Sequence, residues 1–137
     1  MTDSVPGDRS GGCLCEAVRY RAPGGNEFPV LHCHCENCRR LSGNYIAAVR
    51  VRTAELVIDD RGQRLRWYDL PYARYGFCQD CGSTLFYQPA DRSDITSVMA
   101  GTLDQGPDLE VGGVWFADEA RPYSTVSVDV PHHTGNG

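Results

Sequence analysis

Residues 77–83 read FCQDCGS and contain two cysteines that are separated by two residues. A Cys-x-x-Cys pair suits zinc, because a tight turn brings both thiolates to the spacing of a tetrahedral site. Gly82 follows the second cysteine directly, where such a turn usually needs a residue that tolerates a positive φ. One turn of this kind supplies two ligands, whereas a closed structural zinc site has four. The missing ligands must come from elsewhere in the chain.

The other five of the seven cysteines form a pair and a triplet: Cys13 and Cys15, and Cys33, Cys35 and Cys38. The two pairs, including Cys78 and Cys81, can form one closed site of four thiolates. The triplet then has three thiolates and room for a fourth ligand, which is the pattern of a catalytic zinc. This division explains the odd number of cysteines, although spacing alone leaves other groupings open.

The segment HCHCENCRR at residues 32–40 allows three other interpretations of the triplet. His32 or His34 could close it into a second structural site of three cysteines and one histidine. In an extended HCHC run, however, side chains alternate, so the cysteines point to one face and the histidines to the other. A redox-active Cys-x-x-Cys pair is the second alternative, without a thioredoxin-like βαβ pattern to support it. Inert buried cysteines are the third, and three ligand-spaced groups argue against them.

The composition fits one globular domain, since 41% of the 137 residues are hydrophobic and 23% are charged. The odd cysteine count favours metal ligation over a disulfide framework. The N-terminus has no signal-peptide pattern and no apolar run is long enough to span a membrane, so we expect a cytoplasmic protein without a membrane partner. A net charge of −5 disfavours a nucleic-acid partner. We expect a single domain at 11–128 between flexible tails at 1–10 and 129–137.

Short segments of β-type composition recur between turn residues and predict a mainly β fold of small sheets. The expected strands cover residues 16–22, 45–51, 55–59, 64–69, 83–88, 94–101, 111–117 and 124–130. The best helix candidate is a single turn at 36–43 that ends at Gly43. His132 and His133 lie in the expected C-terminal tail, where we interpret them as solvated residues.

Four segments, GGCLCEAVRY, CHCENCRR, FCQDCGSTLF and MAGTLD, resemble in order and spacing the glutathione-dependent formaldehyde-activating enzyme family, whose domain also occurs in centromere protein V. The resemblance implies a β-tent fold, in which small antiparallel sheets are pinned by a zinc ion bound to four cysteines. It also implies two zinc ions per chain. The structural zinc would be held by Cys13, Cys15, Cys78 and Cys81, and the second, open zinc by Cys33, Cys35 and Cys38.

The family reaction implied by the resemblance is of the carbon–sulfur lyase type: glutathione condenses with formaldehyde to S-hydroxymethylglutathione. A zinc ion with three thiolate ligands is electron-rich and a weak Lewis acid, which favours a small-molecule thiol substrate over hydrolysis. Glu36 beside the triplet is a candidate general base, or simply a solvated acid. Arg39 is a candidate for binding a substrate carboxylate, or a charge in a salt bridge or at a helix end.

Two other functions remain open at this stage. The chain could be a non-catalytic zinc module that acts as a scaffold or binds a partner. It could also be an enzyme of this fold whose substrate is unrelated to glutathione. Relatives often have a histidine where this chain has the glycines of GGVWF, residues 112–116, and a small residue in place of Glu36. The sequence fits either a monomer or a homodimer.

Overall fold

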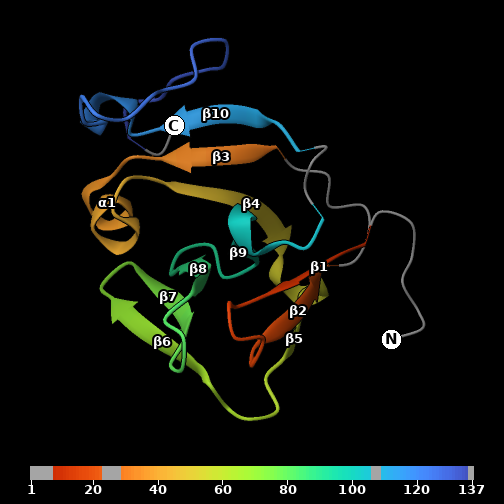
Figure 1. The fold of residues 1–137 in the computed structure, drawn as a ribbon. Helices are drawn as coiled ribbons and strands as arrows, with labels where there is room; N and C mark the ends of the chain where they lie inside the picture. The colour runs from red at the N-terminus through yellow and green to blue at the C-terminus, as the bar shows by residue number, and fades with distance from the viewer. Residues whose placement is uncertain (1–7, 23–28, 106–108, 136–137) are drawn as a thin grey trace. The chain divides into compact units, whose positions relative to one another are not determined.

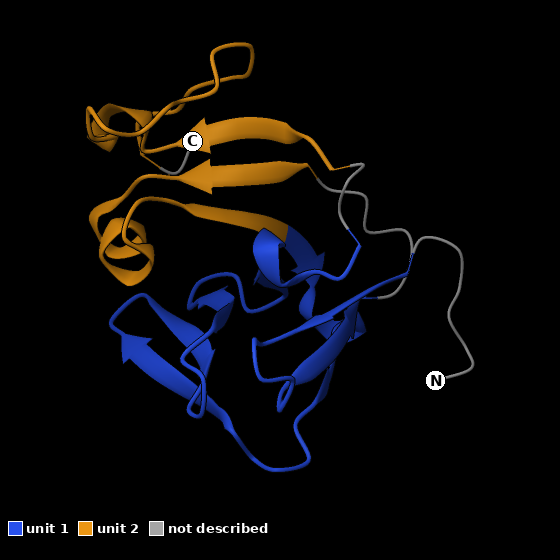
Figure 2. Cartoon of the chain, in the orientation of Figure 1, with its two compact units in different colours: residues 1–28, 50–106 blue, residues 29–49, 107–137 orange. Residues whose placement is uncertain are grey.

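The computed structural model of the chain describes residues 8–22, 29–105 and 109–135. Most of its regular structure is β, and the described residues contain one short α-helix. The chain divides into two compact units, which Figure 2 colours separately: unit 1 comprises residues 1–28 and 50–106, and unit 2 comprises residues 29–49 and 107–137. The mainly β class predicted from the sequence is therefore confirmed.

Unit 1 contains two sets of antiparallel strands (Figure 1). The first set, in the order β1-β2-β5, comprises β1 (Arg9–Gly12), β2 (Arg19–Ala22) and β5 (Val57–Asp59). In the second set, β9, β8, β7 and β6 are successive neighbours. Their bounds are β6 (Leu65–Leu70), β7 (Ala73–Cys78), β8 (Thr84–Pro89) and β9 (Ile95–Met99). Two short 3₁₀ turns also belong to this unit: Thr53–Glu55 precedes β5, and Ala100–Thr102 follows β9.

The core of unit 1 includes two of the candidate metal ligands. Val18, Leu85 and Phe86 are fully buried, and Cys13 and Cys78 pack in the same cluster. Burial of such apolar side chains is the main favourable term in folding. The cysteines are thus positioned by the core and by their backbone.

A buried tyrosine adds a polar contact to this core. Burial alternates along β2, which turns Tyr20 and Ala22 inward as expected for a strand. The Tyr20 ring meets Phe86 edge-on at 5.3 Å between centroids. Its hydroxyl lies 2.7 Å from the hydroxyl of Thr102, which itself donates to the Met99 carbonyl at 2.7 Å. The Tyr20 hydroxyl is therefore the donor in this pair.

Unit 2 is built around β3 (Val30–Cys33), which lies between two strands (Figure 1). It pairs antiparallel with β4 (Ile46–Arg52), whose last residues belong to unit 1, and parallel with β10 (Val111–Trp115). Helix α1 (Glu36–Ser42) connects β3 to β4, and a 3₁₀ turn, Ala117–Glu119, follows β10. The helix ends where the sequence predicts, because Gly43 adopts φ +89° and its N–H bonds to the Arg39 carbonyl.

The strand predictions differ from the structure in several places. Strands β1, β3 and β7 were not predicted, and the β10–β3 pair is parallel where we expected antiparallel sheets. The predicted strand at 124–130 is absent, and Val128 within it is 81% exposed. An alternating pattern forms a strand only where its apolar face can pack, and this segment has no such face.

Described residues in both of the expected tails make regular contacts with the rest of the chain. Residues 1–7 of the expected N-terminal tail lie outside the described residues, whereas β1 already begins at Arg9. At the other end, the Val114 N–H donates to the Pro131 carbonyl at 2.9 Å, and the His133 N–H donates to the Val114 carbonyl at 2.8 Å. This segment supplies partners to edge groups of β10. No helix among the described residues has the length and apolarity to cross a membrane.

Candidate metal centres

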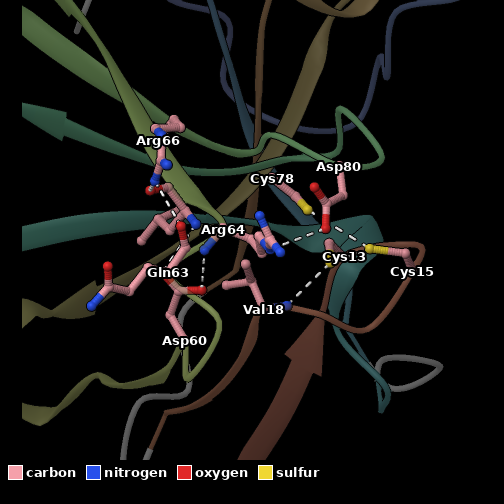
Figure 3. Close-up of polar contacts among 10 residues, drawn as sticks. Cys13, Cys15, Val18, Asp60, Gln63, Arg64, Arg66, Cys78 and Asp80 are labelled. Carbon is pink, nitrogen blue, oxygen red and sulfur yellow. Dashed lines mark hydrogen bonds and ion pairs between the residues drawn. The ribbon is translucent and has the colours of Figure 1, made fainter.

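Four cysteine sulfurs converge in unit 1, from Cys13, Cys15, Cys78 and Cys81, all within 4.8 Å of one another. The Cys15 sulfur lies 3.7 Å from that of Cys13 and 3.7 Å from that of Cys78 (Figure 3). Zinc–sulfur bonds of about 2.3 Å in a tetrahedron separate the sulfurs by about 3.8 Å, so this spacing fits a bound ion. A disulfide would need about 2.05 Å, and all seven cysteines are free thiols.

The turn that carries Cys78 and Cys81 is closed by backbone hydrogen bonds. The Gly82 N–H donates to the Cys78 carbonyl at 2.8 Å, and the Cys78 N–H donates to the Ser83 carbonyl at 3.0 Å. Gly82 has φ +80°, and no heavy atom lies within 4 Å of where a Cβ would be. The glycine is therefore required by the backbone conformation and not by lack of space.

The turn that carries Cys13 and Cys15 is built in a similar way. The Glu16 N–H donates to the Cys13 carbonyl at 3.1 Å, and Glu16 adopts φ +66°. The Val18 N–H donates to the Cys13 sulfur at 3.3 Å (Figure 3). This hydrogen bond and the one to the Cys13 carbonyl hold the turn around Cys13.

Ser83 connects the two turns and was not identified by spacing arguments. Its hydroxyl accepts a hydrogen bond from the Leu14 N–H at 2.9 Å and lies 3.2 Å from the Cys81 sulfur. Burial raises the pKa of the Cys81 thiol, but hydrogen bonds from Ser83 and Cys15 together outweigh it and lower this pKa to about 5. The sequence signal that could have revealed this role is a hydroxyl residue directly after Cys-x-x-Cys-Gly.

The loop before β6 contacts the two residues that lie between Cys78 and Cys81 (Figure 3). The Asp60 carboxylate accepts hydrogen bonds from the N–H groups of Arg64 at 2.7 Å and Leu65 at 2.9 Å. The Arg64 carbonyl accepts from the Gln79 N–H at 2.8 Å, and its guanidinium lies 3.4 Å from the Asp80 carboxylate. The loop thereby fixes the residues between the two cysteines, mainly through its backbone, since exposed ion pairs contribute about 1 kcal/mol or less.

The second group of three sulfurs lies in unit 2. Cys33 ends β3, Cys35 is the N-cap of α1, and Cys38 is buried in the first turn of α1, with their sulfurs within 4.8 Å of one another. Hydrogen bonds from the Cys33 and Cys38 thiols, followed by those from nearby backbone N–H groups, lower the pKa of the Cys35 thiol to about 2. The hydrogen bonds among the three thiols also raise the pKa of Cys33 to about 11 and raise that of Cys38. Three sulfur donors form a soft set, which fits zinc.

His32 and His34 lie apart from this group. They are 9% and 2% exposed, and their rings pack against Tyr45 at centroid distances of 4.5 and 5.0 Å. Neither ring belongs to the set of ligand atoms that lie within 4.8 Å of one another in the described residues. Burial lowers the pKa of both histidines, so the rings are neutral at neutral pH. This placement is the alternation expected of an extended HCHC run.

The candidate general base, Glu36, and the candidate substrate-binding residue, Arg39, both lie on α1. The Glu36 carboxylate is 3.1 Å from the Arg40 guanidinium, and both side chains are exposed. Arg39 is half-buried, and its guanidinium has no ion-pair partner among the residues that the structure describes. A half-buried guanidinium without an acidic partner is available to an anion from solution.

Comparison with known families matches residues 8–118 to the glutathione-dependent formaldehyde-activating enzyme family. The chain belongs to this family. Its fold also resembles a crystal structure of a Rhodobacter sphaeroides protein, with a TM-score of 0.61 and 22% sequence identity over 90% of this chain and 98% of that one. At this identity the likeness concerns the fold.

The range matched to the formaldehyde-activating family includes both groups of cysteines and Ser83. It ends before the C-terminal segment that lies along β10, which includes His133. The matched range therefore contains both groups of cysteines but not this segment.

Proposed function

We propose that the protein is a zinc-dependent enzyme of the carbon–sulfur lyase type, which adds a thiol to a small carbonyl compound or removes it. The formation of S-hydroxymethylglutathione is the specific form of this proposal. The observation that carries it is the group of Cys33, Cys35 and Cys38, which no histidine or carboxylate joins among the described residues. Three protein ligands with an open position are typical of catalytic zinc sites. Membership of a family described as glutathione-dependent and formaldehyde-activating supports the same chemistry.

The two groups of sulfurs would hold two zinc ions with different roles. At the four-cysteine site, four thiolates would enclose a zinc ion, which would stabilise the fold by joining two parts of unit 1 that are distant in the sequence. At the three-cysteine site, a bound zinc ion would lower the pKa of a substrate thiol and keep it as a thiolate. We also propose that the protein acts in the cytoplasm, where free cysteines such as these remain reduced.

The proposed reaction forms one carbon–sulfur bond. The thiol sulfur bonds to the carbonyl carbon, the π electron pair of the carbonyl moves to its oxygen, and the proton lost by the thiol ends on that oxygen. We assign the transfer of this proton to Glu36, because its exposed pair with Arg40 is worth only about 0.3–0.5 kcal/mol and is easily broken. We assign binding of a substrate carboxylate to Arg39.

An enzyme with a substrate unrelated to glutathione is the second candidate. It is favoured by β10, where Gly112 and Gly113 stand at the position for which the family resemblance often implies a histidine. A Cβ at Gly113 would come within 2.5 Å of the Trp115 ring, so the indole fills the space that a side chain would take there. A changed side chain at this position is a reason to expect a changed substrate.

The deciding experiment combines zinc content with reaction rate. The wild type should contain two zinc ions, and it should accelerate adduct formation from glutathione and formaldehyde above the uncatalysed rate, measured by NMR. Cys33→Ser and Cys38→Ser variants should lose one zinc and the acceleration while remaining folded. Full zinc and full activity in these variants would contradict the proposal. Two zinc ions with acceleration of other thiols or carbonyls, but not of this pair, would support the second candidate.

A further inference from the structure

Unit 2 places Trp115 in register with a cysteine of the three-cysteine site. In the parallel pairing of β3 and β10, Trp115 is the partner of Cys33. Partner residues in adjacent parallel strands direct their side chains to the same face of the sheet. The Trp115 carbonyl also accepts a hydrogen bond from the His34 N–H at 3.0 Å. The indole therefore lies on the cysteine face, beside the strand that carries Cys33.

The C-terminal segment adds one more residue, His133, beside Trp115 on this face of the sheet. Val114 and His132 form a parallel bridge, in which both polar groups of the Val114 backbone bond to residues 131 and 133. Because side chains alternate along each strand, the next residues, Trp115 and His133, share the opposite face. Their rings pack against each other with centroids 4.5 Å apart and an angle of 38° between the ring planes. Cys33, Trp115 and His133 thus follow one another across the sheet, and steps of about 4.8 Å put His133 on the order of 10 Å from Cys33.

The position of the indole is fixed from two sides. Gly113 lies beneath it, since a Cβ at that residue would meet the ring at 2.5 Å, and the His133 ring lies against it. Trp115 and His133 are both half-buried, so part of each ring remains accessible. An ordered aromatic ring with an exposed part offers binding area at low cost in conformational entropy.

The backbone after Trp115 is held in a costly conformation that keeps this arrangement. Phe116 adopts φ +51°, a left-handed conformation that is unfavourable for a bulky residue by about 1–3 kcal/mol. Two hydrogen bonds fix the turn: the Phe116 N–H donates to the Gly135 carbonyl at 3.1 Å, and the Ala117 N–H to the His133 carbonyl at 2.9 Å. Such conformations concentrate at ligand sites.

We propose that Trp115 and His133 form a second binding subsite for the thiol substrate of the three-cysteine site, an inference that rests on the proposed function. With its sulfur at Cys33, Cys35 and Cys38, the substrate would cross the indole face and reach the imidazole with its far end. His133 would bond there to a carboxylate or an amide, since an imidazole can donate or accept a hydrogen bond. The subsite selects an extended thiol, about 10 Å long with a polar far end, over a short alkyl thiol.

The test compares two thiols of different length on the zinc-loaded full chain. Glutathione and 2-mercaptoethanol are titrated by calorimetry and by tryptophan fluorescence, against the wild type, His133→Ala and His133→Gln. In His133→Ala, we expect glutathione to bind about tenfold more weakly, as for one lost charge-assisted hydrogen bond, while 2-mercaptoethanol changes less than twofold. His133→Gln should recover most of the loss. His132→Ala is the matched control and should leave both affinities unchanged.

The fluorescence arm reports on the indole itself. Glutathione, but not 2-mercaptoethanol, should change the emission of the wild type, and Trp115→Phe should remove that change. Gly113→Ala, which displaces the indole while keeping both rings, should lose the discrimination between the two thiols even if His133→Ala does not fold. Equal weakening of both thiols in His133→Ala, or no fluorescence response despite binding, would overturn the subsite and leave the proposed function intact. Failure of the wild type to bind either thiol would contradict both.

Discussion

Individual side chains outside the cysteine groups decide how well those groups can bind a metal. Ser83 is the clearest case, because one hydroxyl accepts from the Leu14 N–H and lies 3.2 Å from the Cys81 sulfur. Spacing identified the cysteines but could not identify Ser83, since the contact with Leu14 joins residues 69 positions apart. Mutation of a residue that forms a hydrogen bond with a metal ligand usually lowers the affinity for the metal by about 10–100-fold.

Ser83→Ala should therefore weaken zinc binding at the four-cysteine site by about 10–100-fold. Competition with a chromophoric chelator measures the affinity, and the thiolate-to-metal bands of the cobalt form report on this site directly. Ser83→Thr keeps the hydroxyl and should restore binding. Ser97→Ala in β9 is the matched control, and an affinity loss as large in that variant would assign the effect to general destabilisation.

Arg39 provides a second test at the scale of one residue. If its guanidinium binds a substrate carboxylate, Arg39→Ala should raise KM for glutathione by about tenfold, because a charge-assisted hydrogen bond contributes about 1.5–3 kcal/mol. The kcat should change little, since the interaction is present before and during the reaction. Arg61→Ala, a highly exposed arginine in unit 1, serves as the control. An unchanged KM in Arg39→Ala would contradict the assignment.

Tyr20 makes stability depend on pH at the alkaline end. Burial raises the pKa of its phenol to about 12, against 10.0 in the unfolded chain. Between these values the folded state binds more protons than the unfolded state, so stability falls as pH rises from 10 to 12. Two pKa units correspond to about 2.7 kcal/mol. Chemical denaturation from pH 8 to 12 should show this decline in the wild type and lose it in Tyr20→Phe.

At the scale of elements, patterns along the sequence succeeded where the deciding contacts are local. Gly43 ends α1 in a left-handed conformation, and Gly82 closes its turn in the same way, both as expected from neighbouring residues. Alternation along HCHC also separated the histidines from the cysteines. Local backbone preferences and strand periodicity act over a few residues, so they can be read from a short segment.

Elements that depend on distant partners could not be predicted in this way. The segment 124–130 alternates like a strand but has no packed face, whereas residues 131–135, interpreted as tail, bond to β10. His133 reaches the cysteine face only through this pairing. No local pattern shows which distant edge a segment will join.

Deletion of the C-terminal segment tests how much this segment contributes to the stability of the fold. Deleting residues 129–137 removes the hydrogen bonds to Val114, Phe116 and Ala117 and exposes the edge of β10. The free energy of unfolding should fall by about 1–3 kcal/mol, since each bond contributes about 0.5–1.5 kcal/mol and part of this offsets the entropy of ordering the segment. Denaturant titration of the zinc-loaded chain measures it. An unchanged midpoint would show that the segment is not held in solution.

At the scale of the whole molecule, each of the two cysteine sites is contained within one compact unit. The closed four-sulfur site belongs to unit 1, and the three-sulfur site belongs to unit 2 (Figure 2). Spacing favoured the division of the seven cysteines into four and three but left other groupings open, and the family resemblance implied the same division. The structure brings the sulfurs together in these groups. The account therefore makes one central claim: two zinc ions of different character bind to one chain.

Crystallography of the zinc-loaded protein at the zinc absorption edge, with and without a soaked thiol, tests this claim most directly. The account predicts two anomalous peaks per chain. One should have four sulfur ligands, and the other should have Cys33, Cys35 and Cys38 with a fourth position taken by water or by the soaked thiol. Absence of the second peak, or closure of that site by His32, His34 or another protein side chain, would contradict it.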